Sequence, residues 1–192
     1  MSKYPKKVGL IAEDESDIDS LKELIKKVTK KENIGFKFFV GRGCGRIKRK
    51  ANDWARQLKL RGCKVLILVH DLDRNNYEVL YKEIKDSIEP FTIADTFISI
   101  PIEEMEAWFL ADPKAIKNAL KLKKDIKTFH HPEKVKSPKE VLAKEIEKAS
   151  NNSKIYINTK HNLLISKKLN VELLKNKCES FNRLCKFSMT KI

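Results

Sequence analysis

The chain has 192 residues, of which 41% are hydrophobic, and its formal net charge is +15. This length is enough for one α/β domain with a core and a smaller appendage, but not for two full-sized domains. The longest apolar runs, such as residues 65–69, are too short to cross a bilayer, so we expect no membrane span. Residues 1–7 lack the apolar stretch of a secretory signal, so we expect a cytoplasmic protein whose four cysteines are reduced.

Predicted strands and helices alternate over the first hundred residues. Residues 7–12 form a short apolar run, which is followed by an acidic turn and by apolar side chains at helical spacing from Ile18 to Val28. A second unit repeats this plan, with a strand over residues 36–40, a glycine-rich basic turn over 41–45 and a helix that ends at Gly62.

The third unit starts with the aliphatic run 65–69, which is typical of a strand buried on both faces of a parallel sheet. A turn with two aspartates follows, then a predicted helix from Asn76 to Ile88 and a fourth strand over 96–100. Strands that alternate with helices of about ten to fifteen residues favour a parallel sheet with right-handed crossovers. We therefore predict an α/β fold with a Rossmann-like, mainly parallel four-stranded sheet flanked by helices.

Charge divides the chain into two parts. Residues 1–112, the predicted α/β catalytic domain, hold 21 lysines and arginines against 19 acids, whereas residues 113–192 hold 20 against 7 and so carry a net charge of +13. Helices are predicted over 114–122 and 138–149, followed by two further short helices. Such a field favours nucleic acid, because each neutralised phosphate releases counterions. A lysine-rich composition with solvated side chains would give the same charge.

Acidic residues follow two of the predicted strands. Glu13 ends the first strand, and Asp71 and Asp73 end the third. A carboxylate at the edge of a core is unfavourable unless a cation pairs with it, and a divalent metal is the natural partner. Residues two apart in an extended segment point the same way, so the two aspartates can share one hard cation. The sequence therefore predicts a metal site at the carboxyl edge of the sheet.

These segments resemble the Toprim family, the domain shared by type IA and type II topoisomerases, bacterial primases and OLD-family nucleases. Residues 12–17 are similar to its strand-one motif, with Asp14 where the family usually has glycine, and residues 70–74 match its D-x-D motif. Residues 102–108 resemble the glutamate, alanine and tryptophan segment of small stand-alone Toprim-like proteins. The resemblance covers roughly residues 6–112.

The resemblance implies a function for the acidic residues. Glu13 would act as general acid/base or metal ligand, while Asp71 and Asp73 would hold Mg²⁺ or Mn²⁺. Two-metal chemistry of the OLD type needs more carboxylates, for which Asp17 and Glu106 are the candidates. Each has a plainer interpretation, since Asp17 could simply complement a helix dipole and Glu106 could belong to a solvated helix start.

Basic residues near the acids are candidates for phosphate contacts. Arg42, Arg46 and Lys48 lie in or after the glycine-rich turn, at the same predicted sheet edge as the acids. The alternative is a flexible turn whose glycines merely permit positive φ. In the C-terminal region the candidates are Lys123, Lys124 and Lys160, and the resemblance extends to Tyr156 and Lys160, which lie close together in the same way in the small Toprim-like proteins.

Three functions remain open from the sequence. The first is a Mg²⁺-dependent nuclease for DNA or RNA, which by the resemblance would act in prokaryotic defence against phage or mobile DNA. Because the chain has no Walker A motif, an ATPase partner would be a separate protein. The second is a non-catalytic module that binds nucleic acid or protein, and the third is a metal-dependent phosphatase or nucleotidyl transferase for a small substrate.

Overall fold

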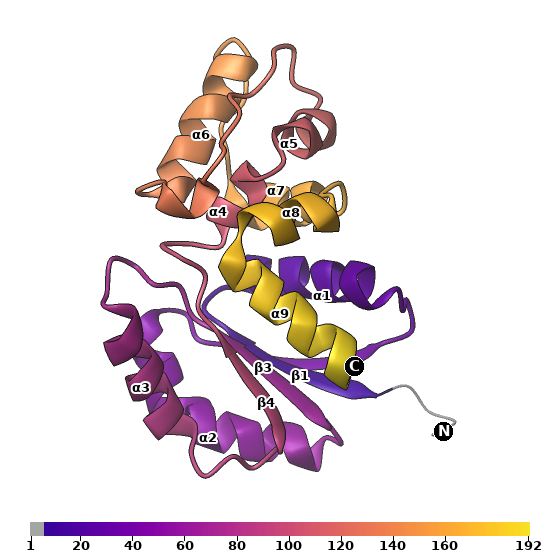
Figure 1. Ribbon diagram of the computed structural model, residues 1–192, viewed down its shortest axis with the longest axis vertical. Helices are drawn as coiled ribbons and strands as arrows, with labels where there is room; N and C mark the ends of the chain where they lie inside the picture. The colour runs from indigo at the N-terminus through magenta and orange to yellow at the C-terminus, as the bar shows by residue number, and fades with distance from the viewer. Residues whose placement is uncertain (1–5) are drawn as a thin grey trace.

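Apolar runs bounded by turn residues form the four strands of one parallel sheet (Figure 1). The computed structural model describes residues 6–192, apart from the side chain of Cys44. The strands lie in the order β2-β1-β3-β4, and every neighbouring pair is parallel, so the predicted four-stranded α/β sheet is confirmed. Their bounds are Lys7–Ala12 for β1, Gly35–Val40 for β2, Val65–Val69 for β3 and Asp95–Ser99 for β4.

Helices cover both faces of the sheet. Val8, Leu10 and Ala12 of β1 pack toward one face with the apolar side of α1, while Ile11 packs toward the other with α2 and α3. β3 is aliphatic throughout because both of its faces are buried in the same way. The three helices run over Glu15–Thr29 for α1, Cys44–Leu60 for α2 and Tyr77–Ile88 for α3.

The remaining helices follow β4 in the chain and lie over the carboxyl end of the sheet and over its α1 face (Figure 1). Three helices follow α6, whereas two were expected, and α9 is a full 13 residues long. Sequence periodicity missed it because α8 and α9 abut at Cys178 without a turn residue between them. Their bounds are Glu106–Leu110 for α4, Pro113–Leu120 for α5, Pro138–Ala149 for α6, Asn158–Ser166 for α7, Val171–Lys177 for α8 and Glu179–Lys191 for α9, with a short 3₁₀ turn at Pro132–Lys134.

The C-terminal helices share a core with the sheet. Trp108 is fully buried, its ring meets Phe181 of α9 edge-on at 5.2 Å between centroids, and its indole N–H donates to the Ser180 hydroxyl at 2.8 Å. Phe187, further along the same helix, stacks on Phe97 of the edge strand β4 at 4.9 Å. The basic C-terminal region is therefore helical, as expected, and it is also the layer that closes one face of the sheet.

Strand order determines where a site can form. The chain leaves β1 for β2 on one side and later returns to β3 on the other, so the carboxyl ends of β1 and β3 form the topological switch point of the sheet. The turn after β2 is tight, because a Cβ at Gly41 would lie 2.6 Å from Cγ1 of Ile47. Backbone N–H groups of Gly41 and Arg42 donate to the carbonyls of Ala12 and Glu13, both at 2.8 Å, which fixes this turn against the end of β1.

Two further expectations concern the thiols and the membrane. Cys63, Cys178 and Cys185 are buried free thiols, as expected, while the side chain of Cys44 lies outside the described atoms. Between residues 6 and 192, no helix has the length and apolar character needed to cross a bilayer.

Because α9 contributes core rather than surface, we expect Phe181→Ala to destabilise the protein by about 3–5 kcal/mol, the usual range for an aromatic side chain removed from a packed interior. Met189 lies on the same helix with 64% of its surface exposed, so Met189→Ala should change stability by less than about 0.5 kcal/mol. Urea unfolding of both variants gives the comparison. Equal, small effects would mean that α9 is a detachable appendage.

Candidate metal and active site

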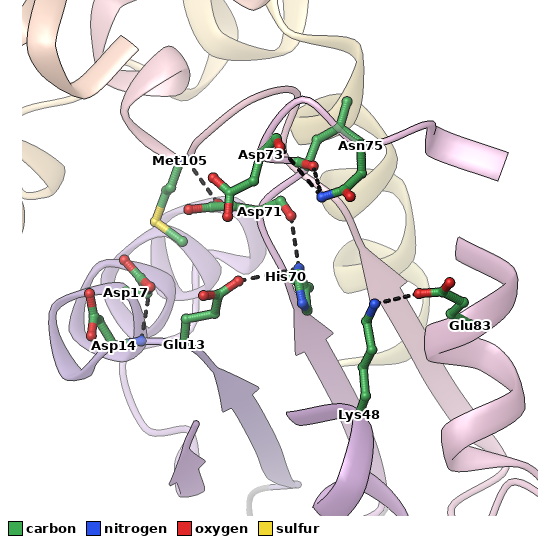
Figure 2. A network of polar contacts seen from close by, with 11 residues as sticks. Glu13, Asp14, Asp17, Lys48, His70, Asp71, Asp73, Asn75, Glu83 and Met105 are labelled. Carbon is green, nitrogen blue, oxygen red and sulfur yellow. Dashed lines mark hydrogen bonds and ion pairs between the residues drawn. The ribbon is translucent and has the colours of Figure 1, made fainter. Parts of the chain in front are cut away.

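Acidic side chains from four segments lie near one another at the carboxyl edge of the sheet, and Figure 2 shows those of Glu13, Asp17, Asp71 and Asp73. The segments are the turn after β1, the first turn of α1, the turn after β3 and the start of α4. The negative charges of the other members raise the pKa of Asp71, and Glu106 and Glu13 also raise the pKa of Asp17. We call this group the acidic cluster, and its members are Glu13, Asp17, Asp71, Asp73 and Glu106.

The turn after β3 is held as an extension of the sheet. The N–H groups of His70, Leu72 and Asp73 donate to backbone carbonyls in the segment 99–103 at 3.1, 3.2 and 3.0 Å. Leu72 is buried on one side of this extension, so Asp71 and Asp73 are directed to the other side, as the sequence spacing predicted. Asp71 is fixed further, because its Oδ1 accepts the backbone N–H of Met105 at 3.1 Å.

Asp17 has the helix-start role that the sequence left open, while its role as a metal ligand stays a prediction. Its Oδ2 accepts the backbone N–H of Asp14 at 3.1 Å, which satisfies a free donor at the start of α1. It also faces the other acids. Burial and then the charge of Glu106 raise the pKa of Asp17 to about 8, against a lowering by the Asp14 N–H.

Glu106 is buried rather than part of a solvated helix start. Only 4% of its surface is exposed, and its Oε1 accepts the Tyr156 hydroxyl at 2.9 Å. The hydroxyl also contacts Oδ1 of the Asn162 amide, whose Nδ2 has no partner among residues 6–192. Since a hydroxyl has one proton, turning the amide over would let Asn162 Nδ2 donate to the tyrosine oxygen while the tyrosine donates to Glu106.

Glu104, two residues earlier, accepts the Lys139 N–H at 2.8 Å and so satisfies the start of α6. Of the two neighbouring acids, only Glu106 is directed at the cluster, because it is among the charges that raise the pKa of Asp71 while Glu104 is not. The resemblance favours Glu106 for the same position.

His70 lies behind Glu13 and is 2% exposed. Its Nδ1 is 2.8 Å from the carbonyl oxygen of Asp71 and 3.2 Å from Oε1 of Glu13. Both neighbours are acceptors, so Nδ1 carries a proton, and this proton is directed at the carbonyl. Oε1 of Glu13 therefore has no hydrogen-bond partner among the described residues. A buried carboxylate oxygen without a donor is the kind of atom that a cation would satisfy.

Burial dominates the acidity of the cluster. It raises the pKa of Glu13 and of Asp71, and the neighbouring carboxylates raise the pKa of Asp71 further. His70 acts in the opposite direction on Glu13. Without a cation Asp17, whose pKa is raised to about 8, therefore keeps its proton near neutral pH, and a divalent ion at the cluster would favour its release.

The donor set suits a hard divalent cation, because all five members offer carboxylate oxygens and Mg²⁺ prefers oxygen ligands. In the described part of the chain, however, no three His, Cys, Asp or Glu side chains already stand close enough to hold a metal ion. Asp17, Asp71 and Glu106 are each held by a hydrogen bond within the protein. Ligation would therefore require the oxygens left free by these bonds to move closer together, and the ligand roles stay predictions.

Around the glycine-rich turn, the basic candidates differ in their contacts. Arg42 and Arg46 are exposed, and Arg46 lies over the Trp54 ring at 5.9 Å. Lys48 instead forms an ion pair with Glu83 of α3 (Figure 2). The arginines are therefore better placed to meet a phosphate than Lys48 is.

The C-terminal candidates lie at different distances from the cluster. Lys160 is exposed in the first turn of α7, shortly after Tyr156. Lys124 donates its backbone N–H to Ala149 at the end of α6, whereas the start of α6 is where the Ser137 hydroxyl meets Arg74. Lys123 and Lys124 are thus about the length of α6, roughly 18 Å for 12 residues, from the turn that holds Asp73.

Sequence reasoning missed three contacts of the cluster. It gave no role to Tyr156, did not place His70 beside Glu13, and did not foresee the Met105 N–H. The Tyr156 contact joins residues 50 apart in the chain and has no local pattern. The position of His70 one residue before the D-x-D motif was a usable signal, because it placed the ring next to the carboxyl end of β1.

Comparisons with known proteins give one result. A family model described as a domain of unknown function, DUF4276, matches residues 12–187. No curated protein and no solved structure matches the chain. The matched range contains the whole acidic cluster together with Tyr156 and His70, and it leaves the resemblance to the Toprim family a prediction.

In the absence of divalent ions, we expect the free energy of unfolding to fall as pH rises from about 4 to about 8. Over this range the folded protein keeps a proton on Asp17 that the unfolded chain, with the ordinary pKa of 3.8, has released, so ionisation stabilises the unfolded state. Asp17→Asn should flatten the dependence while its amide oxygen still accepts the Asp14 N–H. Urea titrations in EDTA at several pH values measure the slope.

Asp19→Asn is the matched control for this measurement. Asp19 lies two residues further along α1 with 42% of its side chain exposed and pairs with Lys22 at 2.9 Å. Its removal should leave the slope as in the wild type. Superimposable pH profiles for wild type and Asp17→Asn would contradict the raised pKa.

Proposed function

The chain belongs to the DUF4276 family of domains of unknown function, and we propose that it is a Mg²⁺-dependent nuclease that hydrolyses phosphodiester bonds of DNA or RNA. One observation carries the proposal. Carboxylates from four segments converge at the switch point of a parallel sheet, where α/β proteins bind their ligands, and burial has raised the pKa of several of them. Such a cluster is unfavourable until positive charge enters it.

Asp71 and Asp73 are the proposed ligands of the first Mg²⁺, with Asp17 and Glu106 available for a second. A bound Mg²⁺ would polarise the scissile phosphate and lower the pKa of a water molecule. Asp71 is held by the Met105 N–H through Oδ1, so its other oxygen remains for a ligand. The turn after β3 cannot swing away, because its backbone is bonded to the segment after β4.

Glu13 is the proposed general base. Burial raises its pKa, which makes it a better proton acceptor near neutral pH than an exposed glutamate. His70 Nδ1–H, 3.2 Å from Oε1, lies on the protein side of the carboxylate and leaves the opposite side for water. The proton taken from water would pass to Glu13 as water adds to phosphorus, and the leaving oxygen would be protonated from solvent.

Tyr156 is the proposed positioning residue for Glu106. Burial and the adjacent Glu106 raise the pKa of the Tyr156 hydroxyl, so it remains protonated and continues to donate its hydrogen bond. A ligand held by such an outer contact keeps a single orientation. The C-terminal helical region thereby contributes to the site without a metal ligand of its own.

Nucleic acid is the proposed substrate because the chain carries a net charge of +15 around an acidic site. The candidate phosphate contacts are Arg42, Arg46 and Lys160, with Lys123 and Lys124 reaching only a substrate that extends past the start of α6. The resemblance to Toprim nucleases adds the proposal of an effector role in prokaryotic defence. That proposal includes a cooperating ATPase, whose Walker A motif would lie outside residues 1–192.

One observation favours the non-catalytic alternative, a nucleic-acid or protein binding module. Several carboxylates of the cluster already have hydrogen-bond donors inside the protein, as structural acids do. In that case the acids would stabilise turns, and removal of one would lower stability without affecting any metal-dependent reaction. The two functions therefore differ in what a single ligand variant does.

Asp71→Asn should lower Mg²⁺-dependent cleavage at least about a hundredfold, because it removes a ligand and several kcal/mol of metal-derived transition-state stabilisation. Melting temperature in EDTA should stay the same or rise, since the amide oxygen can still accept the Met105 N–H and one like charge is gone. Cleavage of single-stranded DNA, duplex DNA and RNA is measured beside the melting curves. Asp86→Asn, at an exposed position of α3, is the matched control.

If Asp71→Asn cleaves at the wild-type rate, the acids have a structural role. The same conclusion follows if the variant is less stable but its metal-dependent cleavage is unchanged. The wild-type protein should also gain melting temperature with Mg²⁺ or Mn²⁺, a readout that does not depend on a chosen substrate.

Tyr156→Phe should weaken Mn²⁺ binding about ten- to a hundredfold, the range observed when an outer partner of a metal ligand is removed. The aromatic ring still fills its site, so the fold should persist. Tyr81→Phe on α3, where the ring stacks on Tyr77, provides a tyrosine control outside the cluster. Calorimetric titration with Mn²⁺ gives both affinities, and equal affinities for the two variants would remove Tyr156 from the site.

A further inference from the structure

Arginine is concentrated in one short segment of the chain. Of the seven arginines among 41 basic residues, five lie between residues 42 and 61. A lysine-rich composition bias would add lysines and does not explain this concentration. Residues 41–64 hold nine basic residues and one acid, so the net +2 of residues 1–112 conceals a segment at +8 and a remainder at −6.

Helix α2 presents this charge outward. Arg46, Arg49 and Arg56 follow each other at helical spacing on the side opposite the apolar face of α2, and all three are exposed. Arg42 precedes the helix and Arg61 follows it, both exposed. We call these five residues the α2 arginine row. In the described part of the chain, none of them forms an ion pair with an acid.

Two members of the row are held in place by aromatic rings. Trp54 and Phe39 stack at 5.3 Å with an interplanar angle of 5°. The Arg46 guanidinium lies over Trp54 at 5.9 Å, and that of Arg61 lies over Phe39 at 4.7 Å. Stacking limits the motion of a guanidinium yet leaves its N–H donors for a phosphate, so less entropy is lost on binding.

The row begins at the acidic cluster. The Arg42 backbone N–H donates to the carbonyl of Glu13 at 2.8 Å, and α2 then runs along the sheet face opposite α1 and α9 (Figure 1). A helix of 17 residues is about 25 Å long, which corresponds to roughly seven base pairs of duplex. A strand bound along the row would therefore have one end at the proposed general base.

We propose that the α2 arginine row binds the sugar–phosphate backbone of a nucleic acid and leads it to the acidic cluster. The row, rather than the more basic region 113–192, is then the main determinant of affinity. This assignment rests on the proposed nuclease function for its substrate class. Binding along the row uses charge and guanidinium geometry alone, so it is independent of base sequence.

Charge reversal tests the row. The triple variant Arg46→Glu, Arg49→Glu and Arg56→Glu should raise the dissociation constant at least tenfold more than a control triple with the same charge change, Lys114→Glu, Lys144→Glu and Lys186→Glu. The control lysines are exposed on α5, α6 and α9, away from the row. Anisotropy with labelled single-stranded DNA, duplex DNA and single-stranded RNA, in EDTA, separates the possible sources of the phosphate backbone.

Salt dependence gives a second measure. The slope of log affinity against log salt should become shallower by about two to three units for duplex DNA in the row variant, at about 0.9 for each phosphate that the protein no longer neutralises. If the charge-reversed variant unfolds, the glutamine triple at the same three positions replaces it, because it removes charge without adding acids. Its affinity should also fall and its salt slope should also become shallower. Circular dichroism melting identifies that case.

Equal loss of affinity in the row and control variants would overturn the proposal, because net charge alone would then explain binding. Unchanged affinity in the row variant, or binding to phosphatidylserine vesicles in place of all three nucleic acids, would overturn it as well. Binding is measured without metal, so the two proposals are tested separately. If the row variant binds nucleic acid as the control does while Asp71→Asn still abolishes cleavage, only the role of the row is refuted. The reverse result refutes only the hydrolytic function.

Discussion

Repulsion among partly buried carboxylates is the constraint on which the arrangement of this protein depends. Parallel strands bring the ends of β1 and β3 together, and both ends carry acids. Three of these acids are each restrained by a different part of the chain: Asp71 by the Met105 N–H, Asp17 by the Asp14 N–H and Glu106 by Tyr156. The fold therefore holds like charges together that would separate in a flexible chain, which is what a site that awaits a cation requires.

Local patterns predicted the parts of the structure that local interactions determine. The aliphatic run of β3 and the alternation of strand and helix gave the parallel sheet, and the two-residue spacing of Asp71 and Asp73 gave their common direction. Burial of Glu106 could not be read in the same way, because its partner Tyr156 is 50 residues away and lies just before a helix whose apolar pattern is weak. The layer formed by α9 was missed for the same reason, since Phe181 and Trp108 are distant in sequence.

Charge shows the same difference between sequence and fold. Counted over residues 1–112 and 113–192, +13 of the net charge of +15 lay after residue 112, and this indicated the C-terminal region as the holder of substrate. The acids of the cluster had cancelled the arginines of α2 in that count, although the two groups lie on different surfaces and serve opposite electrostatic purposes. Net charge is a property of a surface, and only the fold assigns residues to surfaces.

The late position of Tyr156 and α9 in the chain has a consequence for biosynthesis. A ribosome delivers Glu13, Asp71 and Glu106 first, but the hydroxyl that orients Glu106 and the aromatic face that closes the sheet emerge only with the last forty residues or so. Until then the buried face of Trp108 and the part of the sheet that α9 contacts through Phe97 have no cover. A nascent chain therefore exposes both its acids and its core, and a chain that stops early never matures into the enzyme proposed above.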